Sequence, residues 1–137
     1  MLSTVEKVLF LKSIELFSQI PGEDLAQVAL IAAEEVRENQ EDIFLEGDVG
    51  DALYIVLGGR VRVHRGERLI AELGERECFG EMAILDSAPR SATVTALTET
   101  NLLKISREDF QEIMSEKPQI GVGIIKVLSR RLREALP

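Results

Sequence analysis

Apolar residues repeat at two different periods along the chain, and the changes of period divide it into three stretches. Over residues 1–36 the spacing of three or four predicts two amphipathic helices, the first being Val5–Phe17. From 37 to 105 the period falls to two, which predicts β-strands. Over 106–137 helical spacing returns, and Pro118 is placed to open the last helix.

The middle stretch is built from short runs separated by glycine-rich turns. The predicted strands are 42–45, 53–56, 60–64, 69–73, 92–96 and 102–105. Many short strands without an intervening long helix indicate an antiparallel sandwich or barrel. In the run 60–64 the alternation turns Val61 and Val63 inward, so we expect His64 to be exposed on the other face.

Length and composition narrow the classes of protein. A chain of 137 residues with 45% hydrophobic side chains fits one domain, 1–137. One cysteine excludes a disulfide framework and a multi-cysteine zinc site, and the single histidine disfavours a His-rich metal centre and a His-based triad. No apolar run approaches the roughly 20 residues of a membrane helix, and no secretory signal opens the chain. We therefore expect a cytoplasmic domain that does not insert into membranes.

Charge is uneven along the chain. The formal net charge is −8, with three basic and twelve acidic side chains in residues 1–51. The last twenty residues carry four basic and one acidic side chain. Because phosphate binding by nucleic-acid proteins depends on many lysines and arginines, this balance disfavours direct DNA binding.

The segment 79–92 breaks the strand pattern and carries candidate chemistry. It is too long for a hairpin loop and contains about one helical turn after Gly80. Amide groups of a first helical turn bind phosphate oxygens, and Arg90 adds a planar fork of donors. Glu81 repels phosphate but can accept a hydrogen bond from a sugar hydroxyl. Together they describe a ribose phosphate site.

The residues F-G-E-M-A-I-L-D-S-A-P-R-S-A-T-V, which begin at Phe79, resemble the phosphate-binding cassette of the cyclic nucleotide-binding domain. That family includes protein kinase A regulatory subunits, nucleotide-gated channels and the bacterial catabolite activator. The segments 43–48 and 50–55 are similar to its first strands, and 129–132 is similar to its last helix. The resemblance implies a mainly β fold, an antiparallel double-stranded β-helix (a jelly-roll-like barrel), with N-terminal helices and two C-terminal helices.

The resemblance also implies a role for each site residue. Glu81 accepts from the ribose 2′-hydroxyl, Gly80 allows close approach, and the amides of Met82 and Ala83 bind the cyclic phosphate with Arg90. Ser91 adds a hydroxyl near the phosphate or purine, and Asp51 orients the arginine. The sugar and base are lined by Val63, Ile70 and Leu73, and the last helix closes over the base with Arg131, Leu132 or Leu136. Gln40 stands where the family usually has glycine.

The function implied is a regulatory sensor whose ligand, cAMP in preference to cGMP, repositions the C-terminal helix. Ser91 underlies the preference, since alanine there goes with cAMP, threonine with cGMP, and the bacterial activator has serine. The last helix can also pair two chains as a homodimer, and we expect the effector domain to lie elsewhere or in a longer protein.

Two other functions remain open from the residues. The first is a ligand-free interaction or dimerisation module that keeps the fold. The second is a cupin-type metal enzyme, which needs two or three histidines where this chain has one. We expect no enzyme, no metal and no cofactor. Phe44 and Tyr54 are interpreted as core residues, and Asp51 is also an ordinary turn residue.

Overall fold

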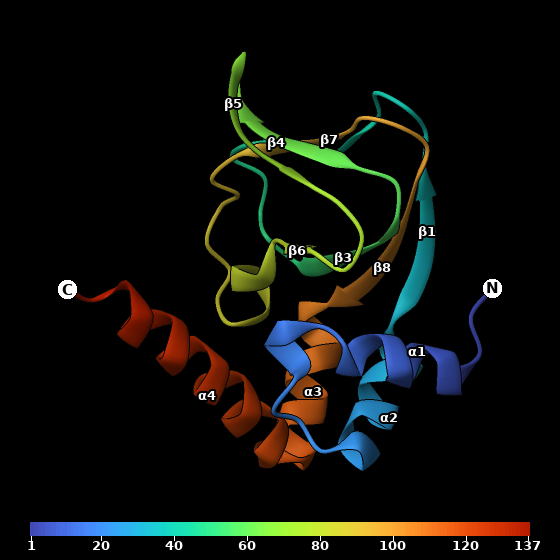
Figure 1. Ribbon diagram of the computed structural model, residues 1–137, viewed down its shortest axis with the longest axis vertical. Helices are drawn as coiled ribbons and strands as arrows, with labels where there is room; N and C mark the ends of the chain where they lie inside the picture. The colour runs from blue at the N-terminus through green and yellow to red at the C-terminus, as the bar shows by residue number, and fades with distance from the viewer. The chain divides into compact units, whose positions relative to one another are not determined.

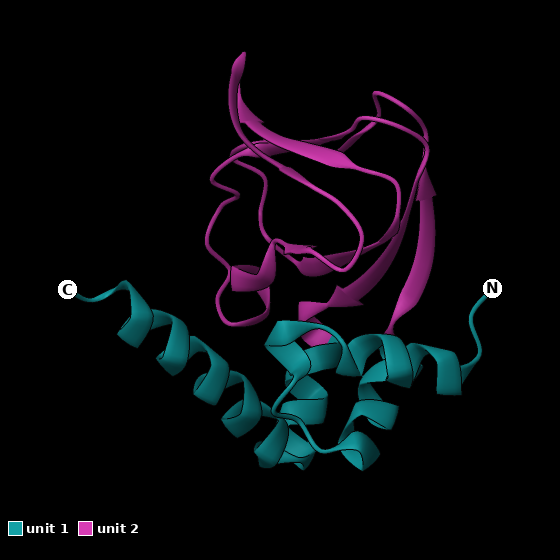
Figure 2. Cartoon of the chain, viewed as in Figure 1, with its two compact units in different colours: residues 1–31, 109–137 teal, residues 32–108 magenta.

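The computed structural model describes residues 1–137, which form two compact units (Figure 2). One unit contains residues 1–31 and 109–137, and the other contains residues 32–108. The helical segments (Figure 1) are α1 (Thr4–Lys12), η1 (Glu15–Phe17), α2 (Gly22–Ile31), η2 (Glu81–Ile84), α3 (Arg107–Glu116) and α4 (Pro118–Ala135). The strands are β1 (Ala33–Arg37), β2 (Asp42–Phe44), β3 (Ala52–Gly58), β4 (Val61–Arg65), β5 (Arg68–Leu73), β6 (Cys78–Phe79), β7 (Thr93–Ala96) and β8 (Thr100–Ser106).

The strand unit consists of two antiparallel four-stranded sheets. Their strand orders are β1-β8-β3-β6 and β2-β7-β4-β5. This arrangement confirms the predicted mainly β fold with flanking helices. A hydrophobic cluster that includes Ile43, Tyr54, Phe79 and Val94 forms the core, with Phe44, Val63 and Leu73 packed against it.

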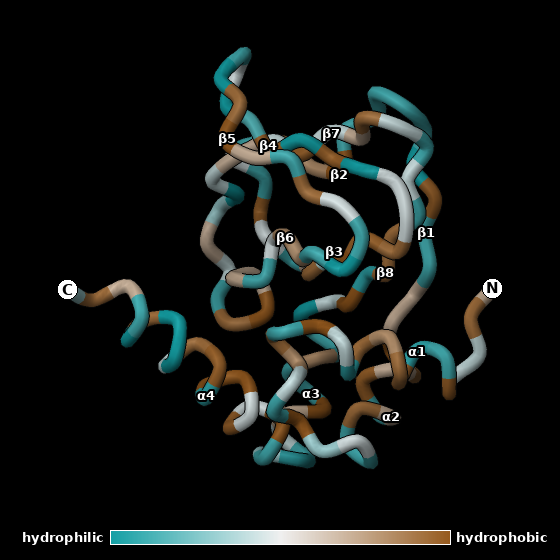
Figure 3. The backbone as a smooth tube through the Cα atoms, viewed as in Figure 1, coloured by the Kyte–Doolittle hydropathy of each residue, from teal (hydrophilic) through white to brown (hydrophobic).

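The unit formed by the chain ends is helical. α1 begins with a capping box, in which the Ser3 hydroxyl accepts from Glu6 N–H and the Glu6 carboxylate accepts from Ser3 N–H. Phe17 and Phe110 pack with ring centroids 6.3 Å apart. α4 starts with Pro118 in its first turn, as predicted, and Figure 3 shows hydrophobic and hydrophilic segments alternating along it. None of the helices is both long and apolar enough to cross a bilayer.

Two helical predictions are wrong in detail. The helical pattern predicted to Val36 ends at Ile31, and 33–37 forms β1, paired with β8. The helix predicted as Val5–Phe17 stops at Lys12: the Ser13 hydroxyl donates to Phe10 O, and Ile14 is extended before η1. Serine competes for backbone hydrogen bonds in this way, which shortens helices.

The expectation of an exposed His64 is also wrong. The residue is only 8% exposed, with Nε2 at 2.8 Å from Thr95 Oγ1 and Nδ1 at 2.8 Å from Gly66 O. The ladder between β4 and β5 shifts register between Val63 and His64. The threonine and the turn carbonyl thus satisfy a polar ring on the face that the alternation assigned to solvent.

The backbone of the turn at Gln40 explains why the family usually has glycine at this position. Gln40 has φ of 72°, in the left-handed region that glycine adopts at least cost. Its N–H donates to Ala96 O at 2.8 Å, so the turn before β2 is kept despite the side chain.

Candidate nucleotide site

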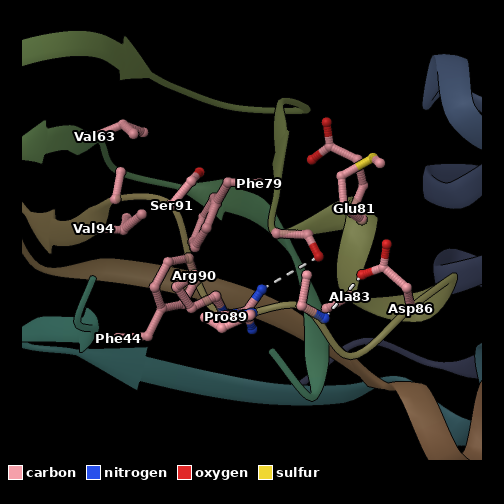
Figure 4. Close-up of a pocket in the computed structure, with 14 residues that line it drawn as sticks. Phe44, Val63, Phe79, Glu81, Ala83, Asp86, Pro89, Arg90, Ser91 and Val94 are labelled. Atoms are coloured by element: carbon pink, nitrogen blue, oxygen red, sulfur yellow. Dashed lines mark hydrogen bonds between the residues drawn. The ribbon is translucent and has the colours of Figure 1, made fainter. Parts of the chain in front are cut away.

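Most residues of the segment 79–92 line a cavity of about 220 Å³ in the strand unit. In Figure 4, Val63, Val94 and Ser91 lie on one side of this cavity, and η2 with Glu81 lies on the other. Gly80 precedes η2 with φ of 75°, so a left-handed residue turns the chain into the short helix. The single helical turn predicted here is the 3-10 turn η2.

Arg90 is the buried cation of the site, with only 8% of its surface exposed. Its Nη2 donates to Ala52 O at 2.7 Å and its Nη1 to Gly80 O at 3.4 Å (Figure 4), while Nε is buried without a partner. Desolvation by burial lowers the pKa of Arg90 below its usual range, against smaller opposing effects of Tyr54 and Asp51. An unpaired buried cation at a cavity wall is suited to an anionic ligand.

The backbone of Arg90 is fixed by the turn before β3. Its N–H donates to Asp48 O at 2.7 Å, and its carbonyl accepts from Gly47 N–H at 2.9 Å. The Asp48 carboxylate closes that turn by accepting from Leu45 N–H at 2.9 Å, and Gly47 has φ of 91°. The glycine-aspartate turn thus positions the arginine from a distant part of the sequence.

The structure brings most of the predicted site residues together. The cavity is lined by Val63, Gly80, Glu81, Met82, Ala83, Arg90 and Ser91. The Ala83 amide, predicted to bind phosphate, donates instead to Gly80 O at 3.0 Å within η2. The Gly80 carbonyl therefore accepts both from Ala83 and from Arg90.

Four predicted residues are not among those that line the cavity. Ile70 is 45% exposed and lies where the β4–β5 register shifts, so its side chain does not follow the simple alternation. Leu73 pairs with Val61 and packs against the core cluster. Asp51 is exposed and forms no ion pair with Arg90. Arg131 belongs to the helical unit, where its Nε donates to Glu15 Oε1 at 2.8 Å.

Several lining residues were not predicted. They are Phe44, Phe79, Asp86, Ala88, Pro89, Ala92 and Val94. Val94 comes from a strand whose alternation could have assigned it to the inner face, whereas Phe44 follows the buried Ile43 where the β2–β7 register shifts. Nowhere in the chain do three or more His, Cys, Asp or Glu side chains gather as metal ligands do.

Comparison with known proteins identifies relatives over most of the chain. The cyclic nucleotide-binding domain family matches residues 34–117. The Cyclic AMP receptor protein of Thermus thermophilus is 44% identical over 98 residues, which is 68% of this chain and 45% of that protein. The chain thus spans less than half of the length of this curated relative.

Solved structures agree in fold. The N-terminal domain of a transcriptional regulator from Streptomyces coelicolor has a TM-score of 0.84 and 33% identity, covering 91% of both chains. The regulatory domain of Toxoplasma gondii PKA, in a co-crystal structure with cAMP, has a TM-score of 0.74 and 33% identity over 80% of this chain and 44% of that one. With the cavity, its buried arginine and the family match over 34–117, the chain belongs to the cyclic nucleotide-binding domain family.

Proposed function

We propose that the cavity binds a cyclic purine nucleotide and that its occupancy regulates the rest of the molecule. The observation that carries the proposal is Arg90, a buried guanidinium with an unpartnered Nε at the wall of a 220 Å³ cavity. The cyclic phosphate supplies the missing counter-charge, and Glu81, which also lines the cavity, accepts from the ribose 2′-hydroxyl. Arginine suits this task because its donors form a fixed planar fork.

The cassette contributes backbone as well as side chains. Met82 N–H and Ala83 N–H bind the phosphate, Gly80 permits its close approach, and Ser91 adds a hydroxyl. Ala83 N–H donates to Gly80 O, so its binding to phosphate requires that hydrogen bond to break, whereas Arg90 has an unpartnered Nε to offer. Val63 lines the base side, with Ile70 and Leu73 of β5 beyond the lining residues. Asp51 acts on Arg90 through its charge without direct contact.

We propose cAMP in preference to cGMP. The hydroxyl of Ser91 is shared with the bacterial activator, which the family resemblance associates with cAMP. A relative named Cyclic AMP receptor protein and a PKA regulatory domain crystallised with cAMP support the same ligand. Titration calorimetry with both nucleotides side by side tests this choice, and tighter binding of cGMP overturns it.

The decisive experiment is calorimetry on the full chain. Arg90→Ala and Glu81→Ala should each weaken nucleotide binding, the former about thirtyfold or more because a charge-assisted contact to phosphate is lost. Arg68→Ala and Glu67→Ala, at exposed positions of the β4–β5 hairpin, serve as matched controls and should bind as the parent does. No heat with cAMP or cGMP at millimolar concentration contradicts the proposed function.

We also propose that occupancy repositions α4 and that α4 pairs two chains. Val122, Ile125 and Leu132 are 49–65% exposed and, with Ser129, follow the three-and-four spacing of a two-helix seam along α4. Leu132→Glu should shift a dimer to monomer in sedimentation velocity. If the parent is monomeric with and without nucleotide, pairing is wrong. The same dimer without any nucleotide binding instead supports a ligand-free interaction module.

The output of the sensor is proposed to lie in another domain of a longer protein or in a partner, acting in the cytoplasm. This arrangement is supported by the match to the Thermus thermophilus protein, which covers only 45% of that protein's length. No enzymatic step is proposed for residues 1–137.

A further inference from the structure

The Arg90 guanidinium lies over an aromatic ring that neither the cassette nor the family resemblance assigns to the site. Its Cζ is 4.0 Å from the ring centroid of Phe44, and both residues line the cavity (Figure 4). Phe44 comes from β2, far along the sequence from the cassette. The contact is well within the roughly 6 Å at which cation–π attraction operates.

The surroundings of Arg90 make this ring important. No carboxylate forms an ion pair with the guanidinium, and its polar partners are two backbone carbonyls. Burial removes most of its hydration, since 8% of the residue is exposed. Cation–π attraction strengthens when the cation is desolvated, so the negative face of Phe44 offsets part of the cost of burying this charge.

Phe44 is itself held in place. Its ring packs at a tilt against Tyr54 and Phe79, with centroids 6.0 and 5.8 Å away, and those two rings stack on each other at 5.3 Å. Three rings that contact one another leave Phe44 little freedom to turn. A fixed ring fixes the plane of the guanidinium that lies over it.

We infer that Phe44 is a positioning residue for the nucleotide site: its ring holds the Arg90 guanidinium at the cavity wall by a cation–π contact, ready for the phosphate. It does the work that the family resemblance assigned to Asp51, which is exposed. The inference rests on the proposed function, because it names what prepares the same arginine. Preorganisation of this kind raises affinity by removing an ordering cost from binding.

The test replaces Phe44 with 4-fluoro-, 3,5-difluoro- and 3,4,5-trifluorophenylalanine, which keep the ring's shape while making its face progressively less negative. The affinity for cAMP, measured by calorimetry on the full chain, should fall stepwise and by about tenfold for the trifluoro ring. The melting temperature of the ligand-free protein should fall slightly along the same series, because the ring also offsets part of the cost of burying Arg90. Phe44→Tyr should retain binding, whereas Phe44→Leu should weaken it as the trifluoro ring does.

The matched control is the same series at Phe110, a buried ring that packs against Phe17 and has no cation over it. It should leave affinity unchanged. Unchanged cAMP affinity across the Phe44 series overturns the inference and leaves the proposed function intact.

A second measurement tests the contact between Phe44 and Arg90 without any nucleotide, and so separates it from the proposed function. NMR measures the rate of rotation about the Arg90 Nε–Cζ bond, which should be slow in the parent and faster in each fluorinated protein. Equal rates overturn the contact itself. If the parent binds neither cAMP nor cGMP, the proposed function is wrong and the role of Phe44 in it falls too, whatever the rotation rates are.

Discussion

At Gly80, the missing side chain leaves room for the Arg90 guanidinium. A Cβ built on Gly80 lies 2.6 Å from Arg90 Nη1 and 3.1 Å from Ala52 O, the carbonyl that accepts from Arg90 Nη2. The position also has φ of 75°, which disfavours any L side chain. Gly80 is therefore needed twice, once for the turn into η2 and once for the arginine.

Gly80→Ala should abolish nucleotide binding because it displaces Arg90 from the cavity wall. Gly66→Ala is the matched control: its φ is 58°, but no atom lies within 4 Å of the added Cβ. Both changes should lower the free energy of unfolding by about 1–2 kcal/mol through backbone strain, and Gly80→Ala somewhat more. Denaturant unfolding measures the loss of stability, and calorimetry with cAMP measures the loss of binding. Equal affinities in the two variants would show that Arg90 tolerates the methyl group.

Among the elements, α4 contains two glycines in very different surroundings. A Cβ on Gly123 lies 2.8 Å from Gln19 O and 3.0 Å from Ile20 Cγ1, so Gly123 lets α4 approach the backbone after η1. A Cβ on Gly121 meets only Met114 Sδ, at 3.4 Å. Gly123 is therefore needed for close packing of α4, whereas Gly121 only lowers the helix propensity of α4.

We expect Gly123→Ala and Gly121→Ala to change stability in opposite directions. Alanine adds up to about 1 kcal/mol of helix propensity at either position. At Gly123 overpacking against a backbone carbonyl costs about 1–3 kcal/mol and outweighs that gain. Urea denaturation of the two variants beside the parent gives the comparison. A stabilised Gly123→Ala protein contradicts the close packing of α4 on residues 19–20.

The ion pair between η1 and α4 gives a pH-dependent contribution. The hydrogen bond from Arg131, and then its charge, lowers the pKa of Glu15 below 4.5. Because the folded pKa is below the unfolded one, the stabilisation is present above pH 4.5 and is lost as the pH falls through the lower, folded pKa. The Glu15 side chain is 58% exposed, so the contribution is at most about 0.5 kcal/mol.

An NMR titration of the Glu15 carboxyl carbon checks this pair. Arg131→Ala should return the pKa of Glu15 toward its ordinary value. Arg130 lies beside Arg131 on α4, and its charge lowers the pKa of Glu15 only weakly, so Arg130→Ala should have much less effect. The titration also tests the ligand role that the family resemblance gives to Arg131. If Arg131 leaves Glu15 for the nucleotide, saturating cAMP raises the pKa of Glu15; if it does not, that role is wrong.

An element or site residue could be predicted where one contiguous segment of the sequence specifies it, and could not where it depends on contacts between distant segments. β3 could be predicted because its apolar run is bounded by the glycine turns 50–51 and 58–59. β1 was missed because its sequence AEEVR is mostly exposed and polar and follows α2 without a glycine or proline. Glu81 and Arg90 could be predicted from one contiguous segment. Phe44 could not, since its contact with Arg90 depends on the pairing of β2 with β7 and on the packing of three rings.

Over the whole molecule, the question is how a ligand in one unit affects the other. The cavity lies in the unit 32–108, and α3 (Arg107–Glu116) is the helix through which the chain passes from that unit into the other. Arg107 N–H, at the start of α3, donates to Asp51 O at 2.8 Å, next to Ala52, whose carbonyl holds Arg90. The backbone of residues 51–52 thus contacts both the Arg90 guanidinium and the first residue of α3.

Hydrogen exchange with and without cAMP measures whether this connection carries a signal. At a nucleotide concentration one hundred times Kd, binding stabilises the unit that binds by about 2.7 kcal/mol, so its most protected amides should exchange about a hundredfold more slowly. If occupancy repositions α4, amides of Pro118–Ala135 also change their exchange rates. The Arg90→Ala protein, given the same nucleotide, should show neither change. Slower exchange confined to residues 32–108 would mean that the two units respond independently, because a ligand can move α4 only if it binds the two arrangements of that helix with different affinity.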